Sequence, residues 1–151
     1  MVIPARVGTP VFLLIEDDPT DVRVLCRALG QASWIPELHV ESSVEAALEY
    51  LSSLEPTDPW PSLAIVDLHL PGLSGHHLLE AASAGHLREH LPMLVLSTSS
   101  TTEDVRRSYD LGAVAHVGKP HHLQDWTCLI DAICVIWARF AEAPTPLGVR
   151  T

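Results

Sequence analysis

The stretch LAIVDLHLP, Leu63 to Pro71, decides the fold of this chain. Its first four residues are apolar and lead directly into the carboxylate of Asp67, and a Pro71-Gly72 turn comes next. A short apolar run with β-branched side chains predicts a strand buried on both faces, as in a parallel sheet. Open α/β folds carry their chemistry at the carboxyl ends of such strands. Asp67 is therefore the first candidate site residue, and its role depends on which residues stand at the ends of the other strands.

Length, composition and charge limit the class of protein. With 151 residues, 47% of them hydrophobic and 19% charged, we expect one globular domain. The formal net charge of −10 argues against a nucleic-acid partner, because phosphate binding needs a basic face. We expect no membrane span and no secretory signal, since every apolar run is short. The three cysteines, Cys26, Cys128 and Cys134, lie in apolar helical contexts, which favours reduced, buried thiols and a cytoplasmic protein.

Four more apolar stretches predict strands. They are Val11–Ile15, an edge strand at Leu38–Val40, Met93–Leu96 and Ala113–Val117. Stretches with helical spacing of apolar residues alternate with them, the last from about His122 to Ala143. This alternation predicts a doubly wound α/β fold, a parallel sheet with helices on both faces. We expect a flexible leader over residues 1–10, one domain over residues 11–143 and a tail over residues 144–151.

Capping residues predict where the helices begin. Asp18 stands before Pro19, which suits the first position of a helix, and Asp21 is expected to bond back to that cap. Ser42 and Ser100 are each followed three residues later by a glutamate, which is the spacing of a capping box. Each of these serines therefore predicts the start of a helix.

The residues at the ends of the predicted strands form one set, because parallel strands end at the same edge of a sheet. The set comprises Glu16, Asp17, Asp67, Ser97 and Lys119. Three converging carboxylates repel one another unless a cation joins them, and oxygen-only ligands suit Mg²⁺. A lysine and a hydroxyl in the same place would bind a phosphoryl group. The set therefore predicts a carboxylate nucleophile, Asp67, in Mg²⁺-dependent phosphoryl transfer.

Four motifs in this order resemble the receiver domain of two-component response regulators. They are LLIEDDP, IVDLHLPGLSG, LVLSTSS and the Lys119-Pro120 pair that comes after Val117. The resemblance covers about residues 11–143. It implies a flavodoxin-like (CheY-like) (βα)5 fold with strand order 2-1-3-4-5. It also implies that a sensor histidine kinase transfers a phosphoryl group from its phosphohistidine to Asp67.

The same resemblance implies a role for each site residue. Glu16 and Asp17 would be the acidic Mg²⁺ ligands together with Asp67. The backbone carbonyl of His69 would be a further ligand. Ser97 would hold the phosphoryl group as the switch hydroxyl, and Lys119 would pair with it.

A narrower resemblance concerns the second half of the chain. LVLSTSS followed by RSYDLGA, and IWARFAEAPTP after the last helix, are similar to the small stand-alone regulators of bacterial and cyanobacterial phytochrome kinases. This resemblance implies a phytochrome-type kinase as partner and an output through protein–protein contacts.

Two features depart from the family pattern. Many receivers carry a switch Tyr or Phe on the fifth strand, where this chain has His116. His69 and Ser99 lie two residues beyond the phosphoacceptor and the switch hydroxyl, where receivers tune the access of hydrolytic water. Neither is an acid or an amide that would orient water. We therefore expect a phosphoacceptor switch with slow autodephosphorylation, and not an enzyme.

The last predicted helix is apolar most of the way round. One stripe consists of Trp126, Ile130, Ile133, Trp137 and Phe140. Such a helix either pairs with a partner or is buried in its own domain. We expect the stripe to form a homodimer interface, and the alternative is that the helix folds back on its own domain.

Two other functions remain open. One is a receiver-like scaffold that never accepts phosphate. The other is an aspartate-nucleophile phosphatase of the haloacid dehalogenase type, although those enzymes use an acid where this chain has His69. The chain's nine histidines, including the doublet His76-His77, are expected to be exposed or capping residues, because their spacing does not fit a zinc site.

Overall fold

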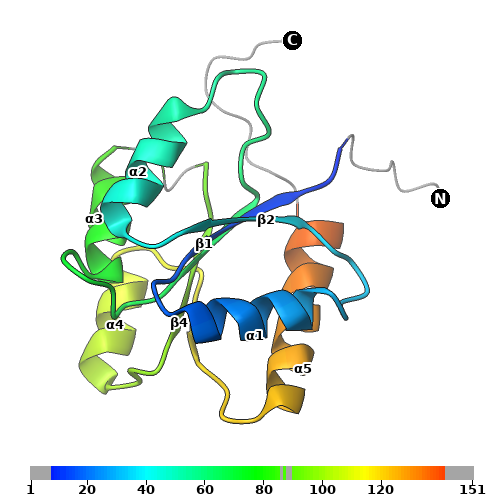
Figure 1. The fold of residues 1–151 in the computed structure, drawn as a ribbon. Helices are drawn as coiled ribbons and strands as arrows, with labels where there is room; N and C mark the ends of the chain where they lie inside the picture. The colour runs from blue at the N-terminus through cyan, green and yellow to red at the C-terminus, as the bar shows by residue number, and fades with distance from the viewer. Residues whose placement is uncertain (1–7, 86, 88–89, 142–151) are drawn as a thin grey trace.

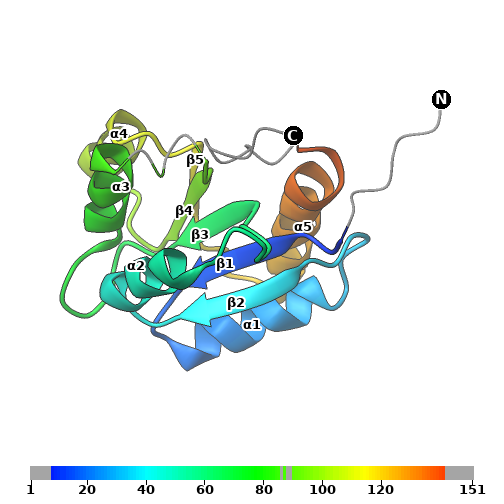
Figure 2. The ribbon, with the colours of Figure 1, turned by 90° about the horizontal axis from the view of Figure 1, so that it is seen from above.

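Five parallel strands form a single sheet in the order β2-β1-β3-β4-β5. The computed structural model describes residues 8–85, 87 and 90–141. Helices α1 and α5 cover one face of the sheet, and α2, α3 and α4 cover the other (Figures 1 and 2). The doubly wound fold and its strand order are confirmed. Most of the predicted leader and the whole predicted tail lie outside the described residues, so the domain boundaries stay predictions.

The strands lie close to their predicted positions. They are β1 Val11–Ile15, β2 Glu37–Glu41, β3 Leu63–Val66, β4 Met93–Ser97 and β5 Ala115–Gly118. β1, β3 and β4 are buried along their whole length, whereas the edge strand β2 is partly exposed. β5 begins two residues later than predicted, because Ala113 closes helix α4 by donating its N–H to Ser108 O at 2.9 Å. Gly112 makes the turn with a φ of 93°.

The sheet separates the core into two layers, each covered by a set of helices. The helices are α1 Pro19–Leu29, α2 Val44–Ser53, α3 Gly75–Ala84, α4 Thr102–Asp110 and α5 Leu123–Cys134, followed by a π-helical segment, η2, Val135–Phe140. Phe12 and Leu14 of β1 pack towards α1 and α5, whereas Leu13 and Ile15 pack towards α2 and α3. This alternation results from the two-residue period of a strand. No helix within the described residues is long and apolar enough to cross a membrane. Cys134 is buried as expected, whereas Cys26 and Cys128 are exposed, so the prediction of buried thiols is wrong for these two.

Two of the three predicted caps are wrong by one residue. Asp18 caps α1 as expected, accepting a hydrogen bond from Thr20 N–H at 2.8 Å. In α2 the cap is Ser43 and not Ser42, and in α4 it is Thr101 and not Ser100. In both cases the adjacent residue also carries a hydroxyl, and the cap is the one whose oxygen reaches the N–H three residues on, at 3.2 Å.

The predicted interface stripe is mostly core. Trp126, Ile130 and Ile133 are 6%, 1% and 3% exposed, because α5 lies against α1 and the sheet. Trp137 is partly buried against the same core cluster, and the side chain of Phe140 lies outside what the structure describes. The prediction that these three residues form a homodimer interface is therefore wrong. For them the alternative holds, a helix packed on its own domain.

Candidate functional site

The sheet holds the residues after its strands side by side. Asp67 N–H donates to Ile15 O at 3.0 Å, and Lys119 N–H donates to Ser97 O at 3.0 Å. These bonds continue the parallel ladder one residue past the strand ends. The residues that follow each strand are therefore held at a fixed place along the same edge of the sheet, as the fold class predicts.

Helix α3 begins in close contact with the end of β3. A Cβ atom at Gly75 would lie 2.2 Å from the carbonyl oxygen of Asp67 and 2.9 Å from a methyl carbon of Val66. Gly75 N–H also donates to Leu68 O at 3.2 Å. The missing side chain is thus what lets α3 pack directly behind Asp67.

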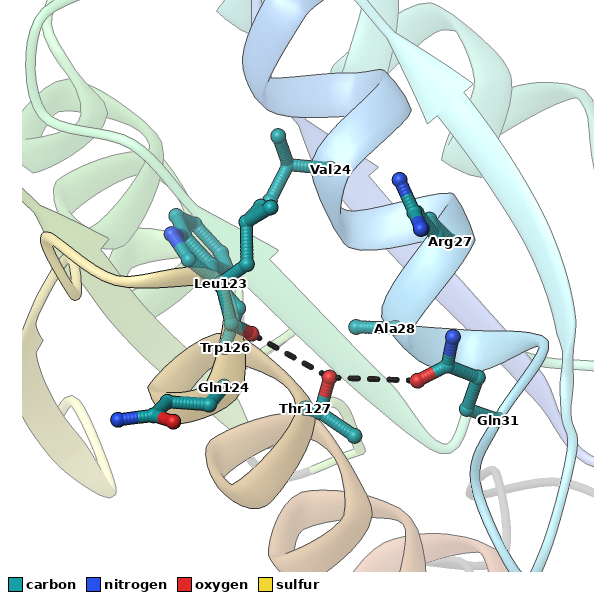
Figure 3. Close-up of a pocket in the computed structure, with 8 residues that line it drawn as sticks. All are labelled: Val24, Arg27, Ala28, Gln31, Leu123, Gln124, Trp126 and Thr127. Carbon is teal, nitrogen blue, oxygen red and sulfur yellow. Dashed lines mark hydrogen bonds between the residues drawn. The ribbon is translucent and has the colours of Figure 1, made fainter.

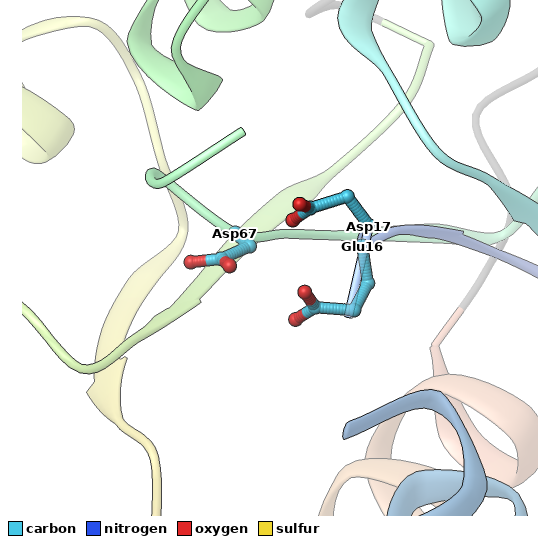
Figure 4. Close-up of side chains that lie close together, drawn as sticks. All are labelled: Glu16, Asp17 and Asp67. Atoms are coloured by element: carbon cyan, nitrogen blue, oxygen red, sulfur yellow. The ribbon is translucent and has the colours of Figure 1, made fainter. Parts of the chain in front are cut away.

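Three carboxylates meet at the ends of β1 and β3. Oxygen atoms of Glu16, Asp17 and Asp67 all lie within 4.8 Å of one another (Figure 4). Glu16 and Asp67 are each 5% exposed, whereas Asp17 is exposed. The cluster therefore has a buried side formed by two acids and an open side formed by the third.

Lys119 joins this cluster from the end of β5. Its Nζ donates to Glu16 Oε2 at 2.7 Å and to Asp67 Oδ2 at 3.1 Å. It also donates to Asp21 Oδ2 at 2.6 Å, the shortest of its three contacts. The sequence predicts the place of Lys119 in the site correctly but assigns Asp21 to the cap of α1. The acid has a local explanation in the first turn of a helix, and the sequence carries no signal of its contact with Lys119.

Burial and ion pairing act in opposite directions on these groups. Burial raises the pKa of Glu16 to about 7, although the Lys119 ammonium and the Asp18 N–H lower it. Burial lowers the pKa of Lys119, but the hydrogen bonds to Asp21 and Glu16 and the charge of Asp67 outweigh burial and raise that pKa overall. The ammonium is therefore firmly protonated, and one positive charge faces several negative ones.

The donor set fits a hard divalent cation. All three candidate ligands are carboxylates, and Asp17 is open to solvent, so that a bound cation could keep water molecules. Carboxylate ligands of this kind suit Mg²⁺ or Mn²⁺ and not zinc, which prefers nitrogen and sulfur ligands. His69 N–H donates to Asp67 Oδ1 at 3.3 Å, while the ligand role of its carbonyl stays a prediction.

Ser97 and Ser99 form the edge of the site at the end of β4. Ser97 is fully buried, and its Oγ accepts a hydrogen bond from Ser99 N–H at 3.2 Å. The Ser99 hydroxyl donates to the carboxylate of Asp104 in α4, and this bond lowers the pKa of Asp104. Both serines are thus hydrogen-bonded between the end of β4 and the start of α4, and Ser97 O also accepts from Lys119 N–H.

His116 is held by a chain of side-chain hydrogen bonds. Its Nε2 lies 2.9 Å from Ser99 O, and its Nδ1 lies 2.9 Å from Ser108 Oγ. Ser108 Oγ in turn lies 3.0 Å from His76 Nε2. Ser108 Oγ also donates to Asp104 O, the carbonyl four residues earlier in α4, at 2.9 Å. Its one hydroxyl proton therefore has two acceptors within reach, Asp104 O and His116 Nδ1. Burial lowers the pKa of His76, and the nearby Arg107 guanidinium adds to this, which agrees with a neutral ring.

We call these hydrogen-bonded side chains the His76–Ser108–His116 relay. They link α3, α4 and β5 to the segment between β4 and α4. His116 was expected at a switch position, but the partners of its ring were not. His76 is 3% exposed, so its predicted exposure is wrong, whereas His77 does cap α3 by accepting from Ser74 N–H at 3.0 Å. The sequence carries no signal that separates the two neighbouring histidines, since burial depends on how α3 packs.

Replacing Ser108 with Ala should lower the free energy of unfolding by about 1–3 kcal/mol, because it leaves the buried Nε2 of His76 and the partly buried Nδ1 of His116 without this partner. Urea denaturation measures this. Ser52→Ala is the matched control, since Ser52 also bonds the carbonyl four residues earlier, at 2.8 Å, but on the exposed face of α2. Its loss should stay within about 0.5 kcal/mol. Equal small losses in the two variants would contradict a structural role for the relay.

A small pocket lies away from the strand ends, between α1 and α5 (Figure 3). Its volume is about 120 Å³, and Thr127 Oγ1 there contacts Gln31 Oε1 at 3.5 Å. Ligand pockets usually enclose about 300–1,000 Å³. The pocket is therefore too small for a substrate of ordinary size, and the chemistry belongs to the strand ends.

Most of this chain is similar to known proteins. Residues 12–131 match the family model of the response regulator receiver domain. The chain is 28% identical over 136 residues to the response regulator Rcp1 of Synechocystis sp., a match that covers 89% of this chain and 92% of Rcp1. The solved Mn²⁺-bound form of Rcp1 superposes with a TM-score of 0.78 and covers 89% of this chain and 99% of that one.

Two further solved structures are similar over nearly the whole chain. The phosphorylated cyanobacterial phytochrome response regulator RcpA has 26% identity and a TM-score of 0.81, covering 91% of this chain and 99% of RcpA. The response regulator RPA3017, from red light signalling of R. palustris, has 26% identity and a TM-score of 0.80, covering 90% of this chain and 99% of its own. The resemblance expected for the second half of the sequence is thus found in the whole fold.

Proposed function

Because this chain belongs to the response regulator receiver domain family, we propose that Asp67 accepts a phosphoryl group from the phosphohistidine of a sensor histidine kinase. A carboxylate oxygen of Asp67 attacks the phosphorus atom, and the phosphorus–nitrogen bond breaks. The imidazole of the kinase leaves with the electron pair of that bond and takes up a proton. The product is an acyl phosphate on Asp67 and a free kinase histidine.

The position of Asp67 among opposite and like charges carries this proposal. Its Oδ2 lies 3.1 Å from the Lys119 ammonium, and its carboxylate lies within 4.8 Å of two other acids. Lys119 can donate to a phosphoryl oxygen without leaving the site, which counters the charge that develops in transfer. Glu16 and Asp17 would hold a divalent cation together with Asp67, and that cation would neutralise phosphoryl charge.

We propose Mg²⁺ as the cation and a phytochrome-type kinase as the partner. The oxygen-only ligands and the open side at Asp17 support Mg²⁺, which keeps several water molecules in proteins. The relatives support the kinase type, since RcpA is a phytochrome response regulator and RPA3017 acts in red light signalling. A cytoplasmic site of action would agree with this partnership.

The chain would act as a switch and not as a turnover enzyme. Ser97 and Lys119 would sense the new phosphoryl group. The His76–Ser108–His116 relay, which contacts Ser99 O, would pass the resulting structural change to α3 and α4. Dephosphorylation would be slow, because His69 and Ser99 are not residues that activate water and the Ser99 hydroxyl is bound to Asp104. A homodimer could use exposed apolar residues such as Ile35 and Ile136, which are 57% and 49% exposed, and sedimentation of both phosphorylation states tests this.

Incubation with acetyl phosphate tests the proposed function directly. With Mg²⁺ present, the intact protein should gain the mass of one phosphoryl group, and hydroxylamine should remove it, as expected for an acyl phosphate. Chelation of the cation with EDTA should suppress the labelling. A protein that stays unlabelled by acetyl phosphate and by phosphorylated kinases would instead be a receiver-like scaffold. Continuous release of phosphate from simple esters would favour the phosphatase.

A further inference from the structure

Lys119 uses its full donor capacity on three different carboxylates. An ammonium group has three N–H donors, and Asp21, Glu16 and Asp67 accept at 2.6, 2.7 and 3.1 Å. The contact with the phosphoacceptor is the longest of the three. In the unphosphorylated protein the ammonium is therefore held most closely by Asp21, a residue with no place in the acid cluster of Figure 4.

A phosphoryl group on Asp67 adds new acceptor oxygens for the same ammonium. Since no donor of Lys119 is free, a full contact with the phosphoryl group must weaken a contact with one of the carboxylates. The cost is lowest for the carboxylate that water can hydrate most easily after the ammonium leaves. The side chain of Asp21 is 28% exposed, against 4% for Glu16 and 6% for Asp67.

The surroundings of Asp21 fit this role. Asp21 and Lys119 both line a pocket of about 280 Å³ beside the ends of β4 and β5, together with Trp126. The pocket offers room for water next to the Asp21 carboxylate. Asp21 also lies on the first turn of α1, a rigid element whose start is fixed by the Asp18 cap. Its negative charge faces the place where phosphoryl oxygens would add further negative charge.

We propose that Asp21 is a positioning residue that holds the Lys119 ammonium in the unphosphorylated protein and releases it to the phosphoryl group on Asp67. Asp21 and the phosphoryl group thus compete for one cation, and Asp21 sets how strongly the phosphorylated form is favoured. This inference rests on the proposed function, because it assumes that Asp67 carries the phosphoryl group.

Beryllium fluoride, which mimics a phosphoryl group on a carboxylate, tests the competition. It is titrated into the full chain at saturating Mg²⁺ and followed by tryptophan fluorescence, to which Trp126 of the same pocket contributes. Asp21→Asn should bind it roughly tenfold more tightly than the unmodified chain, since one charged acceptor of Lys119 is lost. Its affinity for Mg²⁺ should not rise, because the variant removes a negative charge near the cation site.

Two matched variants separate this role from a general effect of charge. Asp21→Glu restores the carboxylate and should bring the affinity back towards that of the unmodified chain. Asp18→Asn removes a negative charge from the same turn while Asn keeps the cap, and should change the affinity by less than about twofold. The inference is overturned if Asp21→Asn binds no more tightly, or if Asp18→Asn shows the same gain.

The same titration keeps the two proposals apart. If the unmodified chain does not bind beryllium fluoride, or if Asp67→Ala binds it equally well, the proposed function itself fails. If the unmodified chain binds it through Asp67 and Asp21→Asn has an equal or weaker affinity, only the role of Asp21 fails.

Discussion

Asp67→Asn should abolish labelling by acetyl phosphate and by a phosphorylated kinase, the largest effect that any single substitution in this chain is expected to have. The carboxamide keeps the size and shape of the carboxylate, although its single oxygen can accept from only one of the two donors, Lys119 Nζ or His69 N–H, that contact different oxygens of Asp67. It lacks the negatively charged oxygen that attacks phosphorus. Intact-mass measurement after incubation with the donor and Mg²⁺ reads out the loss.

The control for this experiment is an exposed acid outside the site. Asp125→Asn changes such an acid in the first turn of α5 and should be labelled to the same extent as the unmodified chain. Circular dichroism of both variants checks that the fold is kept. Undiminished labelling of Asp67→Asn would place the acceptor on another residue, with Asp17 as the first to test because it is the exposed acid of the cluster.

Lys119→Met should cause the second largest effect, on stability. The substitution removes the ammonium and leaves Glu16, Asp21 and Asp67 facing one another at the strand ends. Removing one partner of a buried ion pair costs about 3–5 kcal/mol. Urea denaturation without divalent cations should show a loss of this order. Addition of Mg²⁺ should recover part of it, because the cation replaces the missing positive charge among the same acids.

The pH dependence of this variant depends on Glu16. Burial raises the folded-state pKa of Glu16 to about 7 from its ordinary 4.5, so its folded form retains a proton that the unfolded form has lost. The associated stability is complete below 4.5 and disappears as the pH rises through about 7. Without Lys119 the charged form becomes less favourable still. The loss in Lys119→Met should therefore be larger at about pH 8 than at about pH 6.

Arg107→Met is the matched control for the loss of a cation. Arg107 pairs with Glu80 at 2.9 Å, but both side chains are nearly half exposed. Solvent screens such surface pairs, so this variant should be about as stable as the unmodified chain and insensitive to Mg²⁺. A Lys119→Met variant as stable as Arg107→Met would show that the strand-end acids do not need their cation.

The sequence predicts the position of Asp67 among the other strand-end residues well, because the evidence for it is local. Asp67, Glu16 and Lys119 each come directly after an apolar strand, and the fold class alone brings such positions together. The same logic fails for Asp21 and Ser108. Each has a local explanation, as a helix-start acid or as a helix serine, and its partner lies far away in the sequence. Such contacts are properties of the packed chain.

For the apolar stripe that begins at Trp126, the sequence predicts a contact with a second chain where the structure shows packing within one domain. A helix that is apolar on most sides has one pattern for two situations, burial in its own domain and burial against a partner. Here α1 and the sheet already cover Trp126, Ile130 and Ile133. The period of the pattern also changes, because the backbone passes from α5 into η2 at Val135, and side chains beyond that point no longer keep the spacing of an α-helix.

The segment η2 has a consequence for how the chain aligns with its relatives. Its backbone bonds span five residues, as in the bond from Ala141 N–H to Ile136 O at 2.6 Å, so each turn holds more residues than an α-helical turn. A relative whose last helix is α-helical throughout needs about one residue fewer to reach the same point in space. We therefore expect an alignment of this chain with such a relative to carry a one-residue gap between positions 135 and 141.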